Sequence, residues 1–228
     1  MAGTVLELPQ LRDRRWVFED RADAGRVLAS MLEDHRGGPG LILAVPAGGV
    51  PVAAAMADHL GLPLDLCVVS KILLPWTTEA GFGAVAFDGT VWINEAYVEH
   101  YRLTTEQVEK ATEEAKRKVA SRVARFRKGR PMPELRGRPL FLVDDGLASG
   151  ATLRAGLAAL RRQGAERLSV AVPTAPALGA LELAREVETV YCPNVRRGAT
   201  FAVADAYRNW YDVSEEEVER ILGERAWP

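Results

Sequence analysis

The chain has 228 residues, 48% of them hydrophobic and 26% charged, and its formal net charge at neutral pH is −2. This balance is typical of a globular protein and excludes general disorder. It also argues against nucleic acid as the main partner, because proteins that bind the phosphate backbone usually carry a basic excess. No stretch is apolar enough to span a bilayer, and the first residues lack the core of a signal peptide. We therefore expect a soluble cytoplasmic protein.

The first third of the chain predicts a helix followed by buried strands. Apolar residues at helical spacing predict a helix over residues 19–35 that ends at a glycine-rich stretch. Residues 41–45 and 64–70 are continuous apolar runs of strand length, and a helix is expected between them over residues 50–60. Continuous apolar strands joined by helices favour a parallel sheet that is covered on both faces.

The middle of the chain departs from this pattern. Residues 73–93 are rich in Gly and Thr, and an Asp-Gly pair between two strand-like stretches predicts a hairpin that leaves the sheet and is partly mobile. Thr104 and Gln107 form a capping-box pattern, which predicts the start of a helix that reaches about residue 128. The basic stretch 116–130 is interpreted as a solvated face of that helix.

The second half returns to alternating strands and helices. Ser214 and Glu217 predict the capped start of a last helix. Cys67 and Cys192 lie far apart in apolar runs, so we expect buried, reduced thiols. The predicted fold class is α/β, with a parallel twisted sheet flanked by helices. The remaining predicted elements are strands at 139–144, 167–173 and 188–192, and helices at 152–164 and 177–187.

The segment 141–156, "FLVDDGLASGATLRAG", places two acids and several small residues between a strand and a helix. Ligands of doubly wound sheets bind beyond the carboxyl ends of the strands, and phosphates bind at helix N-termini. A phosphorylated sugar suits this layout, with its phosphate on the loop and its hydroxyls, or a hydrated Mg²⁺, at the acids. The alternative is a polar turn in which Ser149 or Thr152 caps the helix.

The residues "LVDDGLASGAT" resemble the phosphoribosyl pyrophosphate (PRPP) signature of the type I phosphoribosyltransferases. The resemblance implies that Asp144 and Asp145 bind the ribose hydroxyls, act in catalysis and hold Mg²⁺ through water or those hydroxyls. It also implies that the following loop binds the 5′-phosphate of PRPP. The residues of that loop are Gly146, Leu147, Ala148, Ser149, Gly150, Ala151 and Thr152.

Two upstream segments also resemble the family. Ala47, Gly48 and Gly49 match its pyrophosphate loop, although many relatives carry Lys or Arg where this chain has Ala47, so backbone contact is expected. Lys71 matches a basic position that contacts pyrophosphate, and we assign it a catalytic role; the alternative is a solvated strand end. Residues 73–93 correspond to the family's flexible catalytic loop, in which Glu79 is interpreted as exposed rather than catalytic.

Residues 193–213 resemble the family's C-terminal hood. Phe201 and Ala202 would contact the acceptor there, with packing of Phe201 in the core as the alternative. Purine-specific relatives often carry an Asp where this chain has Ala148, which weakens the case for a purine. The sequence therefore leaves the acceptor open among purines, pyrimidines and other amines.

Together these motifs imply one phosphoribosyltransferase domain over residues 1–228. It would be a pentosyltransferase, within the glycosyltransferases, that moves the phosphoribosyl group of PRPP to a nitrogen nucleophile, by preference a nucleobase, and releases pyrophosphate. Mg²⁺ is the expected cofactor. The expected metabolic context is nucleotide salvage and nucleoside metabolism. The expected assembly is a homodimer that has no nucleic-acid or membrane partner. The alternatives are a non-catalytic sensor of PRPP or a nucleotide on the same fold, and another α/β enzyme acting on a sugar phosphate.

Overall fold

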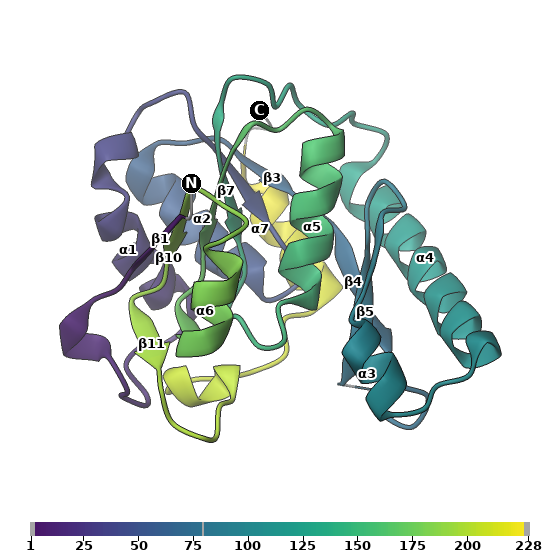
Figure 1. Ribbon diagram of the computed structural model, residues 1–228. Helices are drawn as coiled ribbons and strands as arrows, with labels where there is room; N and C mark the ends of the chain where they lie inside the picture. The colour runs from purple at the N-terminus through teal and green to yellow at the C-terminus, as the bar shows by residue number, and fades with distance from the viewer. Residues whose placement is uncertain (1–2, 79, 226–228) are drawn as a thin grey trace.

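The computed structural model describes residues 3–78 and 80–225, and its centre is a parallel sheet of six strands (Figure 1). All neighbouring strands of this sheet pair in parallel. In spatial order they are β1 (Thr4–Leu6), β10 (Thr189–Tyr191), β8 (Arg167–Ala171), β7 (Pro139–Val143), β2 (Leu41–Ala44) and β3 (Leu64–Leu66). The predicted α/β class is confirmed.

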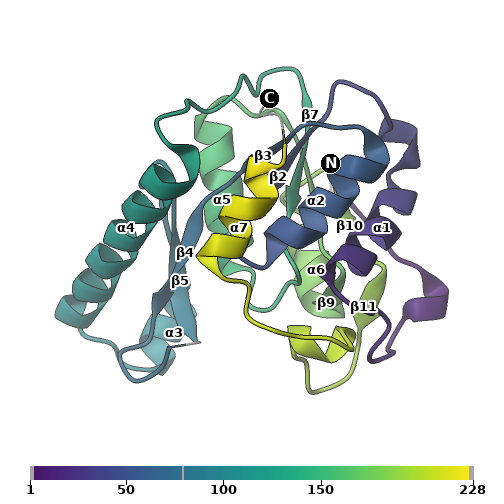
Figure 2. The ribbon, with the colours of Figure 1, turned by 180° about the vertical axis from the view of Figure 1, so that it is seen from behind.

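Helices cover both faces of the sheet, and the alternation of side chains along β2 shows why. Ile42 and Ala44 belong to the core under one group of helices, whereas Leu41 and Leu43 belong to the core under the other. Figures 1 and 2 show the two layers from opposite sides. The first layer consists of α1 (Arg21–Met31), α2 (Gly49–Leu60) and α7 (Glu215–Gly223), and the second of α5 (Ala151–Arg162) and α6 (Ala177–Leu183).

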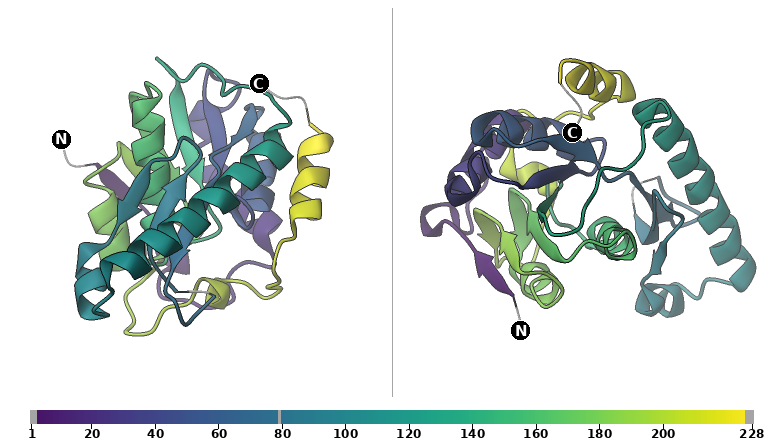
Figure 3. Two further views of the ribbon diagram at one scale, coloured as in Figure 1. Left: turned by 90° about the vertical axis from the view of Figure 1, so that its right-hand side faces the viewer. Right: turned by 90° about the horizontal axis from the view of Figure 1, so that it is seen from above.

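An arm stands beside the sheet, seen from above in Figure 3. Its hairpin turns at Asp88-Gly89, where the sequence predicts it, and Gly89 adopts a positive φ of 85°. The long helix of the arm begins at the predicted capping box. The arm consists of the antiparallel strands β4 (Val69–Leu73), β5 (Gly81–Ala86) and β6 (Val91–Ile93), with α3 (Glu95–His100) and α4 (Thr105–Arg127).

The single strand predicted over residues 64–70 is wrong. β3 ends at Leu66 on the edge of the parallel sheet, and the chain then enters β4 of the arm. The apolar run continues because all of these residues are buried, in one sheet or the other. The apolar pattern reports burial only, so it cannot predict the residue at which the chain passes from one sheet to the other.

A buried ion pair joins the arm to the sheet. Arg127, at the end of α4, donates from Nη1 and Nη2 to the carboxylate of Asp65 in β3 at 3.0 and 2.8 Å. Both residues are at most 6% exposed. Burial raises the pKa of Asp65, although Arg127 opposes that rise. The pair therefore links the end of α4 to the edge strand of the sheet.

The N-terminal segment and the C-terminal hood form one unit. Phe18 and Tyr207 make an isolated parallel bridge, and Phe18 N–H donates to Ala206 O at 3.0 Å. β9 (Thr174–Pro176) and β11 (Asn194–Arg196) form a two-stranded parallel sheet that the sequence did not predict, like the edge strand β1. No helix within residues 3–78 and 80–225 has both the length and the apolar character needed to cross a membrane.

Candidate functional site

A cavity of about 710 Å³ opens at the carboxyl ends of β2 and β7, between the hood and the arm. Most of the predicted site residues line it, and they come from three separate segments of the chain. Gly49, Ala151, Phe201 and Ala202 do not line it. The predicted residues that do are Ala47, Gly48, Lys71, Asp144, Asp145, Gly146, Leu147, Ala148, Ser149, Gly150 and Thr152.

Asp144 and Asp145 follow β7 directly, and each is held by contacts of a different kind. The Asp144 carboxylate accepts a hydrogen bond from the backbone N–H of Asp145 at 2.9 Å. The carbonyl of Asp145 accepts the Tyr207 hydroxyl at 2.6 Å. Burial, followed by the neighbouring charge of Asp145, raises the pKa of Asp144 well above its ordinary value. Two adjacent, poorly solvated carboxylates are suited to binding hydroxyl donors or a cation.

The turn after β2 packs against these carboxylates. A Cβ at Gly48 would lie 2.0 Å from Oδ2 of Asp145, and a Cβ at Gly49 would lie 2.7 Å from the carbonyl oxygen of Val143. The peptide between Pro46 and Ala47 is cis. The Gly49 amide donates to Val45 O at 3.0 Å, so in this structure it points back into the turn. Glycine is required at position 48 because the Asp145 carboxylate takes up the space of a side chain.

The loop after Asp145 ends at the N-terminus of α5 without a side-chain cap. Gly150 is the N-cap residue, with a positive φ of 77°, and neither Ser149 nor Thr152 caps the helix as the alternative interpretation required. The Ser149 hydroxyl is 3.5 Å from the Ala151 amide, a contact too long to satisfy it well. Uncapped amides at a helix N-terminus favour an anion such as phosphate.

Arg21, the first residue of α1, pairs with Asp145 across 124 positions of sequence. Its Nε and Nη2 lie 2.9 Å from Oδ2 of Asp145, and Nη1 donates to the Tyr211 carbonyl at 2.8 Å. The guanidinium carbon is 4.0 Å from the centroid of the Trp210 ring, and Arg21 is only 3% exposed. Arg21 opposes the rise in the pKa of Asp145 that burial causes. It therefore occupies one carboxylate oxygen and leaves the other available.

Arg21 and the walls that the hood and the arm contribute to the cavity were not predicted from the sequence. One local signal existed for Arg21, because a cation in the first turn of a helix is unfavourable to the helix dipole and indicates a partner elsewhere. In the hood, Val203 and Trp210 line the cavity, whereas Phe201 and Ala202 do not. The Val203 side chain lies against Gly146, where a Cβ would be 2.5 Å from it.

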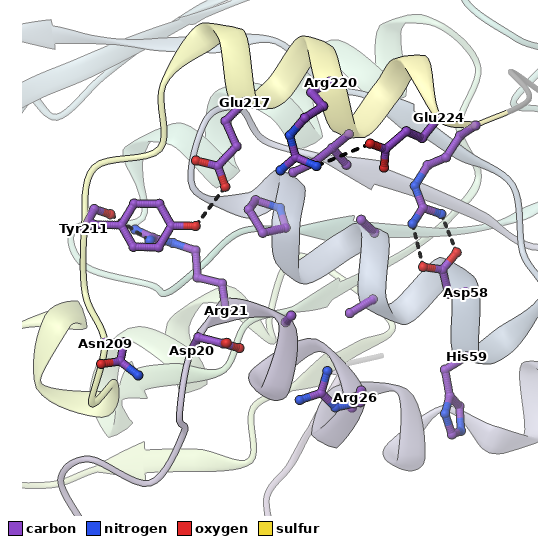
Figure 4. A pocket seen from close by; sticks show the side chains of 16 residues that line it. Asp20, Arg21, Arg26, Asp58, His59, Asn209, Tyr211, Glu217, Arg220 and Glu224 are labelled. Atoms are coloured by element: carbon purple, nitrogen blue, oxygen red, sulfur yellow. Dashed lines mark hydrogen bonds and ion pairs between the residues drawn. The ribbon is translucent and has the colours of Figure 1, made fainter.

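A second cavity, of about 660 Å³, lies on the other side of the Arg21–Tyr211 contact, between α1, α2 and α7 (Figure 4). The figure shows the Tyr211 hydroxyl directed at Glu217, its hydrogen-bond acceptor at 2.8 Å. Ion pairs such as Arg225–Asp58 already neutralise charges in its wall. In the first cavity, by contrast, Lys71 has no ion-pair partner within the described parts of the chain. The first cavity is therefore the better candidate for an anionic ligand.

Comparison with known proteins decides the family. A model described as "Phosphoribosyl transferase domain" matches residues 94–203, which include the loop after Asp145. The crystal structure of TT1426 from Thermus thermophilus is 33% identical, covers 91% of this chain and 98% of its own, and superposes with a TM-score of 0.72. The chain belongs to the phosphoribosyltransferase family.

A Mycobacterium tuberculosis H37Rv protein, Rv0571c, provisionally named a phosphoribosyl transferase, is 36% identical over 206 residues. The match covers 90% of this phosphoribosyltransferase chain but 46% of the relative. The chain thus spans about half the length of the curated relatives it matches. A purine phosphoribosyltransferase from Pyrococcus horikoshii Ot3 is more distant, at 17% identity over 83% of this chain and 97% of that one, with a TM-score of 0.46.

The contacts of Arg21 lead to a first prediction. Replacing Arg21 with Gln should weaken PRPP binding about tenfold or more, because Asp145 loses a charge-assisted hydrogen bond, its ion pair and the orientation that they impose. Arg21→Lys should restore binding only in part, since one ammonium cannot reach both Asp145 and the Tyr211 carbonyl as the guanidinium fork does. Isothermal titration calorimetry with PRPP measures both effects.

Arg26 supplies the matched control for this prediction. It lies on the same helix but pairs with Asp23 at the surface, so Arg26→Gln should bind PRPP like the wild type. Equal affinities for Arg21→Gln and the wild type would show that Arg21 does not position Asp145 for the ligand.

Proposed function

We propose that this phosphoribosyltransferase-family chain transfers the 5-phosphoribosyl group of PRPP to a nitrogen nucleophile and releases pyrophosphate. One observation carries the proposal. The carboxylates of Asp144 and Asp145, the uncapped start of α5 and the ammonium-bearing Lys71 all line one cavity, as a ligand with hydroxyls between two phosphate groups requires.

The proposed pose follows from the chemistry of each wall. The 5′-phosphate would bind the amides of the loop from Gly146 to Thr152, aided by the α5 dipole. The ribose hydroxyls would donate to Asp144 and to the Asp145 oxygen that Arg21 leaves available. The diphosphate would face Gly48 and Lys71. The acceptor would enter from the side of the hood, where Trp210 and Val203 line the cavity. Phe201 and Ala202, the acceptor contacts expected from the sequence, do not line it in this conformation.

The residues present also fit Mg²⁺. Within the described residues no cluster of three or more acidic, His or Cys side chains forms a dedicated metal cage. Two carboxylates beside a phosphate site suit Mg²⁺, which is typically bound by one or two carboxylates together with substrate phosphates and water. Asp144 and Asp145 would hold it, through water or the ribose hydroxyls. When bound, Mg²⁺ would neutralise charge on the diphosphate and so make it a better leaving group.

In the proposed reaction the bond between C1 of ribose and the diphosphate oxygen breaks, and its electron pair leaves with pyrophosphate. The nucleophile's lone pair forms the new bond to C1, and its proton passes to solvent. Positive charge develops on the ribosyl ring meanwhile, and Asp144 and Asp145 stabilise it electrostatically. Closure of the segment 73–93 would exclude water that otherwise hydrolyses this centre; Glu79 lies outside the described residues. Homodimer formation, cytoplasmic location and a role in nucleotide salvage stay predictions.

The test is a pyrophosphate-release assay with PRPP, Mg²⁺ and a panel of nucleobases and small amines, run beside calorimetric binding of PRPP. We expect PRPP to bind and pyrophosphate to be released with one class of acceptor. Binding of PRPP without release across the panel would favour the non-catalytic sensor. Failure to bind PRPP at all, with the protein folded, would refute the proposed function.

A further inference from the structure

The basic stretch 116–130, interpreted from sequence as a solvated face, is exposed at most of its basic residues, but three of its arginines pair with other parts of the protein. Arg122 donates from Nε to Glu215 of α7 at 2.8 Å, and Arg125 contacts three glutamates of that helix. Arg127 pairs with Asp65 in the sheet. Lys118 and Arg122 both line the same cavity as the paired carboxylates, but only Arg122 of the two has an ion-pair partner among the described residues. Lys118 has no hydrogen bond or ion pair to another residue in ranges 3–78 and 80–225.

The spacing of Lys118 and Arg122 creates an unfavourable interaction in the protein alone. Residues four apart on a helix lie one above the other, and like charges at this spacing cost stability. Both side chains line the cavity, and Arg122 is held in place by Glu215. Lys118 is exposed overall, yet its packing against the protein, and then the charge of Arg122, lower its pKa, whereas Glu215 opposes that shift. An anion bound between the two cations would offset their repulsion.

The position of these cations selects one part of the proposed substrate. α4 packs against β4, the strand that carries Lys71, and Lys71 lines the same cavity. Three cationic side chains therefore line the cavity from the arm, whereas the loop that leads into α5 lines it from the end of β7 in the sheet. Since the 5′-phosphate is assigned to α5, the diphosphate is the anionic group of PRPP that is left for these cations.

We propose that Lys118, held beside Arg122 on α4, binds the diphosphate group of PRPP and the pyrophosphate that is released. This inference rests on the proposed function and adds a binding residue from the arm. Lys118 stays protonated throughout and contributes charge and hydrogen bonds to the leaving group. The arm helix thereby becomes part of the substrate site.

Calorimetric titrations test the proposal without knowledge of the acceptor. Inorganic pyrophosphate, PRPP and ribose 5-phosphate are each titrated, in buffer containing Mg²⁺, into the wild type, Lys118→Gln, Lys118→Arg and Arg117→Gln. Arg117 is the matched control, since it is exposed, adjacent on α4 and absent from the cavity wall, and its substitution removes the same charge. Thermal unfolding of each variant verifies that α4 is intact.

We expect Lys118→Gln to bind pyrophosphate and PRPP about tenfold more weakly, as for one lost charge-assisted contact, and ribose 5-phosphate as the wild type does. Lys118→Arg should restore most of the affinity, and Arg117→Gln should show no loss. Unchanged pyrophosphate affinity in Lys118→Gln, or an equal loss for ribose 5-phosphate, would overturn the assignment while leaving the proposed function standing. A wild type that binds none of the three ligands would instead refute the proposed function.

Discussion

Replacing Asp144 with Asn should lower kcat/KM about a hundredfold or more and leave the protein at least as stable as the wild type. The loss follows because Asn offers no negative charge to the ribosyl ring as positive charge develops there. The amide oxygen of Asn can still accept the hydrogen bond from the Asp145 amide, so the local turn is retained. Steady-state kinetics with PRPP and chemical denaturation measure the two quantities.

The stability side of this prediction follows from linkage. The pKa of Asp144 is raised in the folded protein by burial and by Asp145, so the ionised carboxylate disfavours folding at neutral pH. Asn removes that penalty. The stability gained over the wild type should therefore shrink as the pH falls below the raised pKa of folded Asp144 and vanish below the ordinary pKa of a carboxyl group, where Asp144 is protonated in both folded and unfolded states. A variant that keeps wild-type kcat/KM would refute the assigned role.

The same substitution at Asp145 is an informative comparison with Asp144→Asn, because the ion-pair partner of Asp145, Arg21, is buried. Asp145→Asn should lose activity and stability together, since Arg21 would stay behind as a buried cation without its carboxylate. The double variant Asp144→Asn/Asp145→Asn should abolish PRPP binding or turnover. Asp212→Asn is the control, an exposed carboxylate in the same cavity wall, and is expected to keep most of the activity. If all of these variants behave alike, the carboxylate pair has no special role.

Replacing Arg127 with Met should lower the free energy of unfolding by about 3–5 kcal/mol, which would be the largest effect on stability of any single change considered. The substitution leaves Asp65, only 1% exposed, as a buried charge without its partner. Urea unfolding followed by circular dichroism measures the loss. Arg125→Gln, two residues earlier on α4, is the matched control; its contacts are at the surface, so a much smaller loss of stability than in Arg127→Met is expected.

A double variant separates the net value of the pair from the cost of breaking it. Asp65→Leu/Arg127→Met should recover most of the stability lost in Arg127→Met, because burial of both charges is itself costly. The raised pKa of Asp65 agrees with this, since burial outweighs the attraction of Arg127. Equal stability of Arg127→Met and the wild type would show that the pair does not hold the arm to the sheet.

The sequence by itself was enough for the elements whose signals are local. The strand of 139–143, the acids that follow it and the helix that begins after Gly150 are neighbours in the chain, so apolar periodicity and turn chemistry predict their order. The same holds for the capping box at Thr104. These local signals were sufficient for the α/β class and for the segments that supply the proposed phosphate and ribose contacts.

Only the tertiary structure decided what meets those segments. Arg21 reaches Asp145 from 124 residues away, Trp210 comes from the hood, and Lys118 comes from a helix of the arm. Nothing in the local pattern of Lys118 distinguishes it from Arg117 beside it, since both suit an exposed helix face. Which of them faces the cavity depends on the rotation of α4 about its axis. That rotation follows from the packing of the apolar face of α4 and from the contact between Asp65 and Arg127. Such contacts are made between distant segments, and a one-dimensional pattern records only the preferences of neighbours.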